Sequence, residues 1–390
     1  MQKKYFLMLL ITLFYSVSHA QQDTILANLD SSDYLVRRSA LLKIYNDSLY
    51  QYANVLAEKI FQVQEVGMLT EYVRIINYLH HPNAHQIILQ FISGADTLCN
   101  RKYSRDPLRE RVIATGYLIN HQDFSTMYYV QEMIDKTRPD YDIPAFMLLH
   151  SIAKKVPEWE QWAKNELIYA ATNATDNLFR IYAVTWLLSI YGEEMFPLAV
   201  EAARNDPEWG NRDSFIGDLV NNNYTDIHNF LKERLYADPY GTVRWSIADF
   251  LINSVYGQPS DYKFVLDYLP TEIDTNTAYS ISSDLYYNEI PKPDSTVTAL
   301  VMTDTLISYN NQLYNYQWIT SDSLHSNYSA RLQTIRDYIA NSNYTSAQTE
   351  IDAMKASVEE NYNSPSPLLT TEGWKFLHYY LEYIGERINN

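Results

Sequence analysis

The sequence predicts an all-α protein. Only 10 of its 390 residues are glycine, which leaves few positions for the tight turns of β-hairpins. Its hydrophobic content of 46% and charged content of 20% are typical of a chain that folds around an apolar core, and they exclude disorder. Apolar residues recur at helical spacing in a pattern that repeats along the chain. The length suits two domains or one extended array.

The N-terminus has the three parts of a secretory signal peptide. Two lysines precede an apolar run over residues 5–17, and small residues flank a cleavage site after Ala20. The run is shorter than the roughly 20 residues that span a bilayer. We therefore expect residues 1–20 to be cleaved and the mature chain to be exported, periplasmic or secreted, with no integral membrane segment.

Charge and cysteine content narrow the function further. The chain has 47 acidic residues against 30 lysines and arginines, a formal net charge of −17, and would repel nucleic acids and anionic lipids. The single cysteine, Cys99, cannot form an internal disulfide and is interpreted as a buried structural thiol. Export without disulfides favours a bacterial protein.

No motif for catalysis, cofactor binding or metal binding is found. No glycine stands in a dinucleotide, P-loop or nucleophile-elbow motif, and one cysteine excludes cysteine-based zinc sites. The only histidine cluster is His80, His81 and His85. Pro82 places His81 at the start of a helix, so a turn and cap are favoured over a metal site. We predict no catalytic residue, cofactor or metal, and hence a protein that is not an enzyme.

A repeat organises most of the chain. Segments centred on Arg180, Arg212 and Arg244 coincide at an offset of 32 residues, with the same apolar positions around each arginine. The segment around Arg37 follows the same order. Weaker copies are centred on Arg74 and Arg109, and one copy without arginine covers residues 142–152. These copies define seven units, each ending in an amphipathic helix that another helix precedes. Such helix pairs must stack on their neighbours to bury their apolar stripes.

The best copies carry a recognisable motif. The string Asp-x-x-Val-Arg-x-x-Ala-x-x-x-Ile/Leu at Asp33–Ile44, repeated with Phe for Val at Asp176–Leu187, resembles the second helix of HEAT-type repeats. The resemblance covers residues 23–270 and implies an α-solenoid of about seven two-helix repeats over residues 21–270. It also implies a structural ladder that bonds one unit to the next, with the members Asp33, Arg37, Asp176, Arg180 and Arg244.

The pattern stops between residues 271 and 294. Thr, Asn, Ser, Tyr and Asp dominate there, and Pro291 and Pro293 prevent a helix from continuing, so we predict a linker. Four further helices are expected at 294–319, 328–341, 345–360 and 371–389. Their lengths and spacing resemble the small helical modules called FIMAH domains. The module at 295–390 is interpreted as either such a domain or a cap on the open end of the solenoid.

The resemblance also points to a binding surface. The second helices of HEAT-like solenoids line the concave face, and the positions one, two and five after the arginine point away from the core. Those positions hold the candidate partner-binding residues Arg38, Tyr182, Asp213, Trp245 and Asp249. Ordinary solvated surface is the alternative interpretation of each. The 35 tyrosines and 7 tryptophans suit recognition surfaces, including those that stack on glycans.

We therefore predict a non-enzymatic exported scaffold that binds a protein or peptide partner on its concave face. Aromatic anchors in an acidic field favour basic or glycosylated ligands. The alternative is an extracellular protein that binds or degrades glycans, with groove tyrosines and a pair of carboxylates. A third possibility is a spacer within an envelope assembly.

Overall fold

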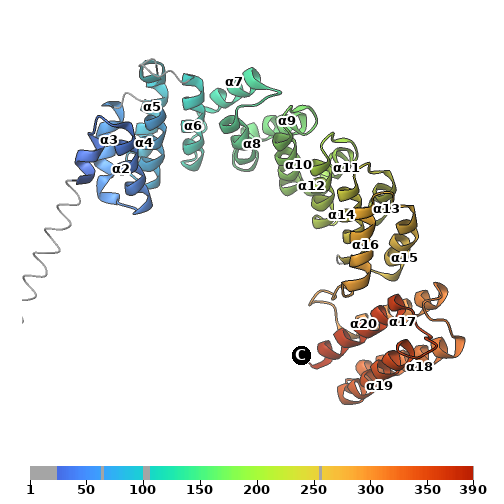
Figure 1. Cartoon of the computed structure of the whole chain (residues 1–390). Coiled ribbons are helices and arrows are strands. Elements are labelled where there is room, and N and C mark those ends of the chain that lie inside the picture. Colours follow the sequence, from blue (N-terminus) through green and yellow to red (C-terminus); the bar gives the residue numbers. More distant parts are fainter. Residues whose placement is uncertain (1–23, 63–65, 100–105, 254–256, 390) are drawn as a thin grey trace, which may run out of the picture. The chain divides into compact units, whose positions relative to one another are not determined.

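A computed structural model describes residues 24–62, 66–99, 106–253 and 257–389. These residues confirm the all-α prediction, because they contain helices and no strand, apart from one isolated bridge between Ile319 and Leu369 (Figure 1). None of these helices combines the length and the apolar character that crossing a membrane requires. The predicted signal peptide at 1–20 lies outside the described residues.

The chain divides into two compact units, Met1–Ile190 and Tyr191–Asn390. The helices of unit 1 are α2 Tyr34–Asn46, α3 Ala53–Lys59, α4 Val66–Tyr78, α5 Ala84–Cys99, α6 Pro107–Asn120, α7 Met127–Thr137, α8 Ile143–Lys155, α9 Pro157–Asn173 and α10 Asn177–Tyr191. The helices of unit 2 are α11 Phe196–Asn205, α12 Trp209–Asn221, α13 Ile227–Ala237, α14 Gly241–Asn253, α15 Pro259–Tyr268, α16 Thr275–Tyr287, α17 Ala299–Asn315, α18 Asp322–Ala340, α19 Tyr344–Tyr362 and α20 Thr371–Asn389.

The helices lie where the sequence pattern predicts them. Helices α10, α12 and α14 begin at Asn177, Trp209 and Gly241, at intervals of 32 residues. The seven motif copies fall on the even-numbered helices α2 to α14, and the odd-numbered helices lie between them. Within unit 1, α4 contacts α2 and α6, and α6 contacts α8; within unit 2, α12 contacts α14. This sequential packing is that of a helical array.

Aspartates at the helix starts cap these helices. Asp33 Oδ1 accepts a hydrogen bond from the Leu35 N–H at 2.8 Å, and Asp176 Oδ1 accepts one from the Leu178 N–H at 2.8 Å. Each bond satisfies a donor that a helix N-terminus leaves unpaired. Asp33 and Asp176 were expected to bond one repeat unit to the next; their hydrogen bonds instead lie at the start of their own helix.

Capping aspartates also correct the register of the copy around Arg109 and fix that of the copy at 142–152. Asp106 caps α6 as Asp33 caps α2, by accepting from the N–H two residues later. The position four residues after the cap, which holds Arg37 in α2, therefore holds Glu110 in α6 and not the neighbouring Arg109. Asp142 caps α8, and the equivalent position is Phe146. Arg109 still joins two copies, since its Nε donates to Asp142 Oδ2 at 2.8 Å.

The segment expected as a linker contains a helix. Helix α16 occupies Thr275–Tyr287, and it packs on α14. Asp274 caps it by accepting from the N–H groups of Asn276 and Thr277, and Ile281 and Leu285 are buried. The expectation that no helix forms between 271 and 294 is wrong over these residues, although Pro291 and Pro293 do lie in non-helical chain. The predicted domain boundaries themselves stay predictions.

The last four helices form a bundle. Each of α17, α18 and α19 contacts the next helix, and α20 returns to contact α17, which closes the ring (Figure 1). The predicted stripes lie inside it, for example Leu332, Ile351 and Phe376. The expected helix at 371–389 is confirmed to the residue. Helix α18 starts six residues before the predicted 328, because Ser321 caps it.

Buried polar groups fasten this bundle to α16. Lys375 of α20 is 3% exposed, and its ammonium donates to the carbonyl oxygens of Leu285 and Asn288 at 2.7 and 2.5 Å. These carbonyls end α16, where a positive charge is favourable. Burial lowers the pKa of Lys375 to about 8. The ring of Tyr262 on α15 also meets Phe376 of α20 edge to face, with centroids 5.1 Å apart.

Candidate functional site

The five predicted binding residues lie in both units. Arg38 is an exposed residue of α2 in unit 1. Tyr182 of α10, also in unit 1, is 41% exposed and stacks on Trp186 at 5.3 Å between centroids. Trp186 in turn stacks on Phe146 at 5.4 Å. Tyr182 is thus the exposed ring of an aromatic stack between α8 and α10. The other three residues lie on adjacent helices of unit 2.

An arginine ladder fixes the even-numbered helices of unit 2. Arg212 of α12 donates through Nε and Nη2 to the carboxylate of Asp238 at 2.8 and 3.0 Å. Its Nη1 donates to the Asp206 carbonyl at 2.8 Å. Burial raises the pKa of Asp238, but hydrogen bonds from Arg212, the Tyr240 N–H and Arg234 outweigh it and leave the pKa below its ordinary value. Asp238 lies just before α14, so its ion pair with Arg212 ties α12 to α14.

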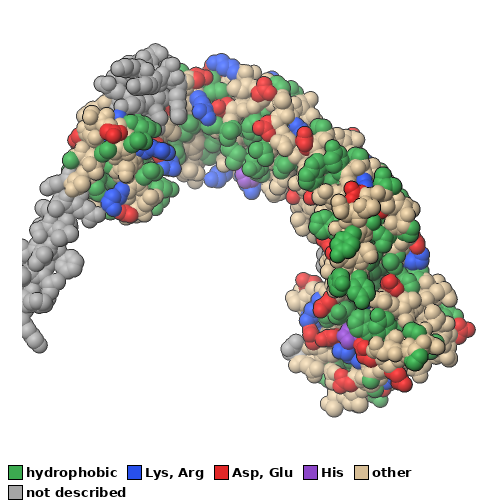
Figure 2. Space-filling view, in the orientation of Figure 1, with side chains coloured by type: hydrophobic (Ala, Val, Ile, Leu, Met, Phe, Trp, Pro, Cys, Tyr) green, Lys and Arg blue, Asp and Glu red, His purple; other side chains and the backbone are tan. Residues whose placement is uncertain are grey.

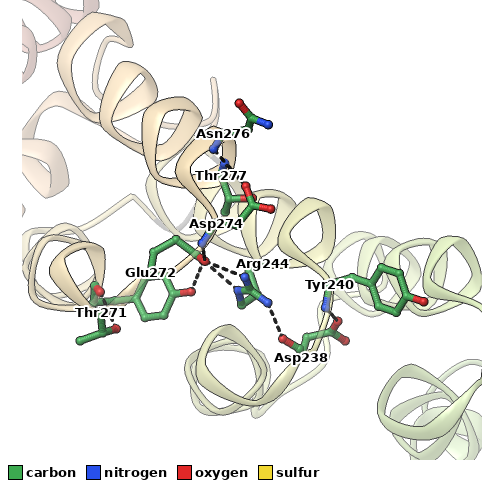
Figure 3. Close-up of polar contacts among 9 residues, drawn as sticks. Asp238, Tyr240, Arg244, Thr271, Glu272, Asp274, Asn276 and Thr277 are labelled. Carbon is green, nitrogen blue, oxygen red and sulfur yellow. Dashed lines mark hydrogen bonds and ion pairs between the residues drawn. The ribbon is translucent and has the colours of Figure 1, made fainter.

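The next step of the ladder repeats this geometry (Figure 3). Arg244 of α14 donates to both oxygens of Glu272 at 2.8 and 2.6 Å, and through Nη1 to the Asp238 carbonyl at 2.8 Å. The Tyr268 hydroxyl and the Asp274 N–H also donate to Glu272. Although burial raises the pKa of Glu272, these hydrogen bonds lower it to about 2. The predicted structural role of Arg244 is confirmed, and Glu272 is the partner that sequence reasoning missed.

A glycine sets how closely α14 approaches α16. A Cβ on Gly241 would lie 2.3 Å from Thr277 Oγ1 and 3.2 Å from Asp274 Cγ, the cap of α16. Any other residue would require the Thr277 and Asp274 side chains to move or the two helix starts to separate. Gly241 therefore leaves the cap of α16 undisturbed beside the start of α14.

The outer faces of α12, α14 and α16 meet along two polar contacts. Trp245 donates through Nε1 to Asp284 Oδ2 of α16 at 2.7 Å. Asp213 of α12 is hydrogen-bonded to Ser246 of α14; burial raises the pKa of Asp213, and this bond only partly offsets the rise. Asp249 lies one turn after Trp245. The structure thus brings together the predicted Asp213, Trp245 and Asp249 and adds Asp284, which the linker assignment had hidden.

Exposed tyrosines extend this face along α16. Tyr279, Tyr286 and Tyr287 are 76%, 63% and 75% exposed. We call the outer faces of α12, α14 and α16 the even-helix surface; its members are Asp213, Trp245, Asp249, Tyr279, Asp284, Tyr286 and Tyr287. In Figure 2, exposed hydrophobic side chains, which include tyrosine in its colouring, lie beside acidic ones on this part of the chain.

The even-helix surface has little positive charge. Helices α12, α14 and α16 contain four aspartates, at 213, 218, 249 and 284, and no lysine. Their only arginines, Arg212 and Arg244, are neutralised inside the ladder by Asp238 and Glu272. The surface therefore presents aromatic rings within a negative field.

The histidine cluster forms a turn, as expected. His81 Nδ1 accepts a hydrogen bond from the Asn83 N–H at 3.1 Å, and its Nε2 lies 2.9 Å from Asn54 Oδ1. In the described ranges, no group of three or more His, Cys, Asp or Glu side chains is arranged to hold a metal ion. The side chain of Cys99 lies outside those described.

Comparison with known proteins assigns no family: the chain matches no protein-family model, no curated protein and no solved structure. The likeness to HEAT-type repeats therefore depends on the motif and on the sequential packing of the helices.

Proposed function

We propose that the chain is an exported, non-enzymatic scaffold of HEAT-type repeats that binds a basic protein or peptide on the even-helix surface. The observation that carries this proposal is the composition of three adjacent helices, α12, α14 and α16. They combine exposed aromatic rings with four aspartates, and their only cations are buried in ion pairs.

Each part of this surface suits the recognition of a basic partner. Trp245 and the tyrosines of α16 offer large ring faces, on which lysine and arginine side chains stack. Asp249 and Asp284 supply a negative field that attracts such a partner and speeds its association. The ladder beneath holds α12, α14 and α16 in place, so little conformational freedom is lost when a partner binds.

The test is a pull-down from the native envelope fraction with residues 21–390, followed by mass spectrometry. The surface variant is Asp249→Asn with Tyr279→Ser, both on the even-helix surface. The matched control is Asp267→Asn with Tyr236→Ser, which changes the same residue types on α15 and α13; Tyr236 is 55% exposed. Neither pair belongs to the ladder, so both variants should fold.

We expect a basic protein that the wild type and the control retain and the surface variant loses by about tenfold. Its retention should weaken as salt is raised. Equal retention by both variants would remove the even-helix surface from the interaction. A glycan array on the same three proteins tests the alternative function, since selective retention of glycans with no protein partner would favour carbohydrate binding by the exposed tyrosines.

A further inference from the structure

Unit 2 contains a pocket that shares no lining residue with the even-helix surface but adjoins it, since Asn253 and Asn288 of the pocket donate to Asp249 and Asp284. Its volume is about 610 Å³, within the range of pockets that hold small molecules. It is lined by the end of α14, the 288–292 segment and one face of α20, through Asn253, Asn288, Glu289, Ile290, Pro291, Lys292, Tyr379, Glu382, Tyr383 and Glu386. Three glutamates and two tyrosines face one lysine across it.

Lys292 shows which groups of the pocket bind a cation. Lys292 forms an ion pair with Glu386 of α20, and its Nζ stands 5.5 Å from the centre of the Tyr383 ring. A carboxylate and a ring face are the two groups with which proteins recognise ammonium ions. The chain's own lysine thus occupies one end of the pocket in the way that a bound ammonium would.

The other acceptors of the pocket are paired less tightly than Glu386. Glu289 forms no ion pair with any described residue. Glu382 has only longer contacts, since Lys355 Nζ and His378 Nε2 both lie 3.5 Å from its Oε2. Asn253 Oδ1 is shielded from solvent and accepts no hydrogen bond in the described structure. These groups can receive the donors of a ligand.

Burial, together with the neighbouring carboxylates, keeps the tyrosine hydroxyls of the pocket protonated. Burial raises the pKa of Tyr383 to about 12, and the charge of Glu289 adds to this rise. Burial also raises the pKa of Tyr379, again with Glu289 and Glu382 adding to it. Both tyrosine hydroxyls stay protonated at neutral pH, and the uncharged rings lie beside the carboxylates.

We propose that this pocket binds a primary ammonium group on a short apolar stem. Glu289 and Glu382 hold the ammonium, and Tyr379 packs against the stem. The ammonium belongs either to a free diamine or to a lysine side chain of a bound polypeptide. The residues that hold the ammonium are not members of the even-helix surface, and the two proposals are tested with different variants and probes, so either can fail without the other.

Isothermal titration calorimetry on residues 21–390 tests the ligand class. The probes are cadaverine, N-acetyl-lysine methylamide and its neutral counterpart N-acetyl-norleucine methylamide. We expect binding of at least one amine and none of the norleucine compound. Tighter binding of cadaverine identifies a free diamine as the ligand, and tighter binding of the lysine compound identifies a side chain. Failure of both amines to bind, or equal binding of the norleucine compound, would overturn the proposal.

Two matched pairs of variants test the position of the ligand. Glu289→Gln should weaken amine binding by about fivefold, whereas Glu360→Gln on α19 makes the same charge change outside the pocket and should have little effect. Lys292→Met removes the internal competitor and should strengthen binding, whereas Lys263→Met on α15 should not. Both glutamates are exposed, so neither glutamine variant should unfold the chain. Equal affinities within each pair would place the amine elsewhere and overturn the proposal.

Discussion

Two ion pairs with the same spacing in the sequence behave in opposite ways in the two units. In unit 2, Arg244 donates to both oxygens of Glu272 at 2.6 and 2.8 Å, and the arginine side chain is 9% exposed. In unit 1, Arg138 makes one hydrogen bond to Glu166 at 3.0 Å, and its side chain is 39% exposed. The pKa of Glu272 is lowered to about 2, whereas the pKa of Glu166 is raised.

The number of donors explains this difference. Burial raises the pKa of both carboxyl groups. Glu272 receives hydrogen bonds from the arginine, the Tyr268 hydroxyl and the Asp274 N–H, and these outweigh its burial. Glu166 receives one from Arg138, and its Oε2 is buried without a donor. An arginine and a glutamate 28 residues apart therefore stabilise the packing of neighbouring helices only where the local chain supplies the remaining donors.

The largest expected difference in stability between the two ion pairs appears when the arginine of each pair is replaced. Arg244→Met leaves the Glu272 carboxylate buried without its cation and should lower the free energy of unfolding of unit 2 by about 3–5 kcal/mol. Arg138→Met removes a half-exposed partner and should cost unit 1 less than about 1 kcal/mol. Hydrogen exchange read by mass spectrometry separates the two units, since α14–α16 and α7–α9 give different peptides. Similar losses in both variants would contradict the comparison.

The pH dependence should also differ in sign. Because the folded-state pKa of Glu272 lies below its ordinary 4.5, its stabilisation of unit 2 is present above that pH and is lost as the pH falls toward 2, by about 3 kcal/mol. Glu166 has a raised folded-state pKa, so its contribution is present below pH 4.5 and is lost as the pH rises through that folded-state pKa. Acidification should therefore weaken exchange protection in α14–α16 before it weakens α9. Earlier loss in α9 would reverse this order.

The smallest expected effect is the change in stability when each glutamate is replaced by glutamine at neutral pH. Glu166→Gln removes a buried charge that is poorly solvated and should stabilise unit 1 by up to about 1 kcal/mol. Glu272→Gln should destabilise unit 2, because a neutral amide cannot replace the carboxylate that Arg244 binds with two bonds. Thermal unfolding of the two variants at pH 7 gives the comparison, and destabilisation by Glu166→Gln would count against it.

The helices were predictable where the residues that set them act locally. Caps such as Asp33 and Asp176, and the apolar residues that follow them, are set by helix geometry, so their spacing predicted α2, α10, α12 and α14. The weak copies were harder to place, because the ladder position holds Glu110 in α6 and Phe146 in α8. Only the cap, and not the arginine, is common to these copies.

Helix α16 shows where the sequence could not suffice. Its residues include threonines, asparagine, serines and tyrosines, which have modest helix propensity, and the segment reads as a linker. It forms a helix because it packs on α14, where Gly241 admits the cap Asp274. The partner of Trp245, Asp284, and three exposed tyrosines of the even-helix surface were missed with it.

The sequence by itself determined the helical class, the acidic charge, the 32-residue interval and the structural role of Arg244, because each depends on composition or on residues close together in the chain. Only the tertiary structure decided that Glu272 receives Arg244, that Asp284 receives Trp245 and that α20 closes a pocket over Glu289. These contacts join residues 28 to more than 90 positions apart, and their geometry depends on how whole helices pack.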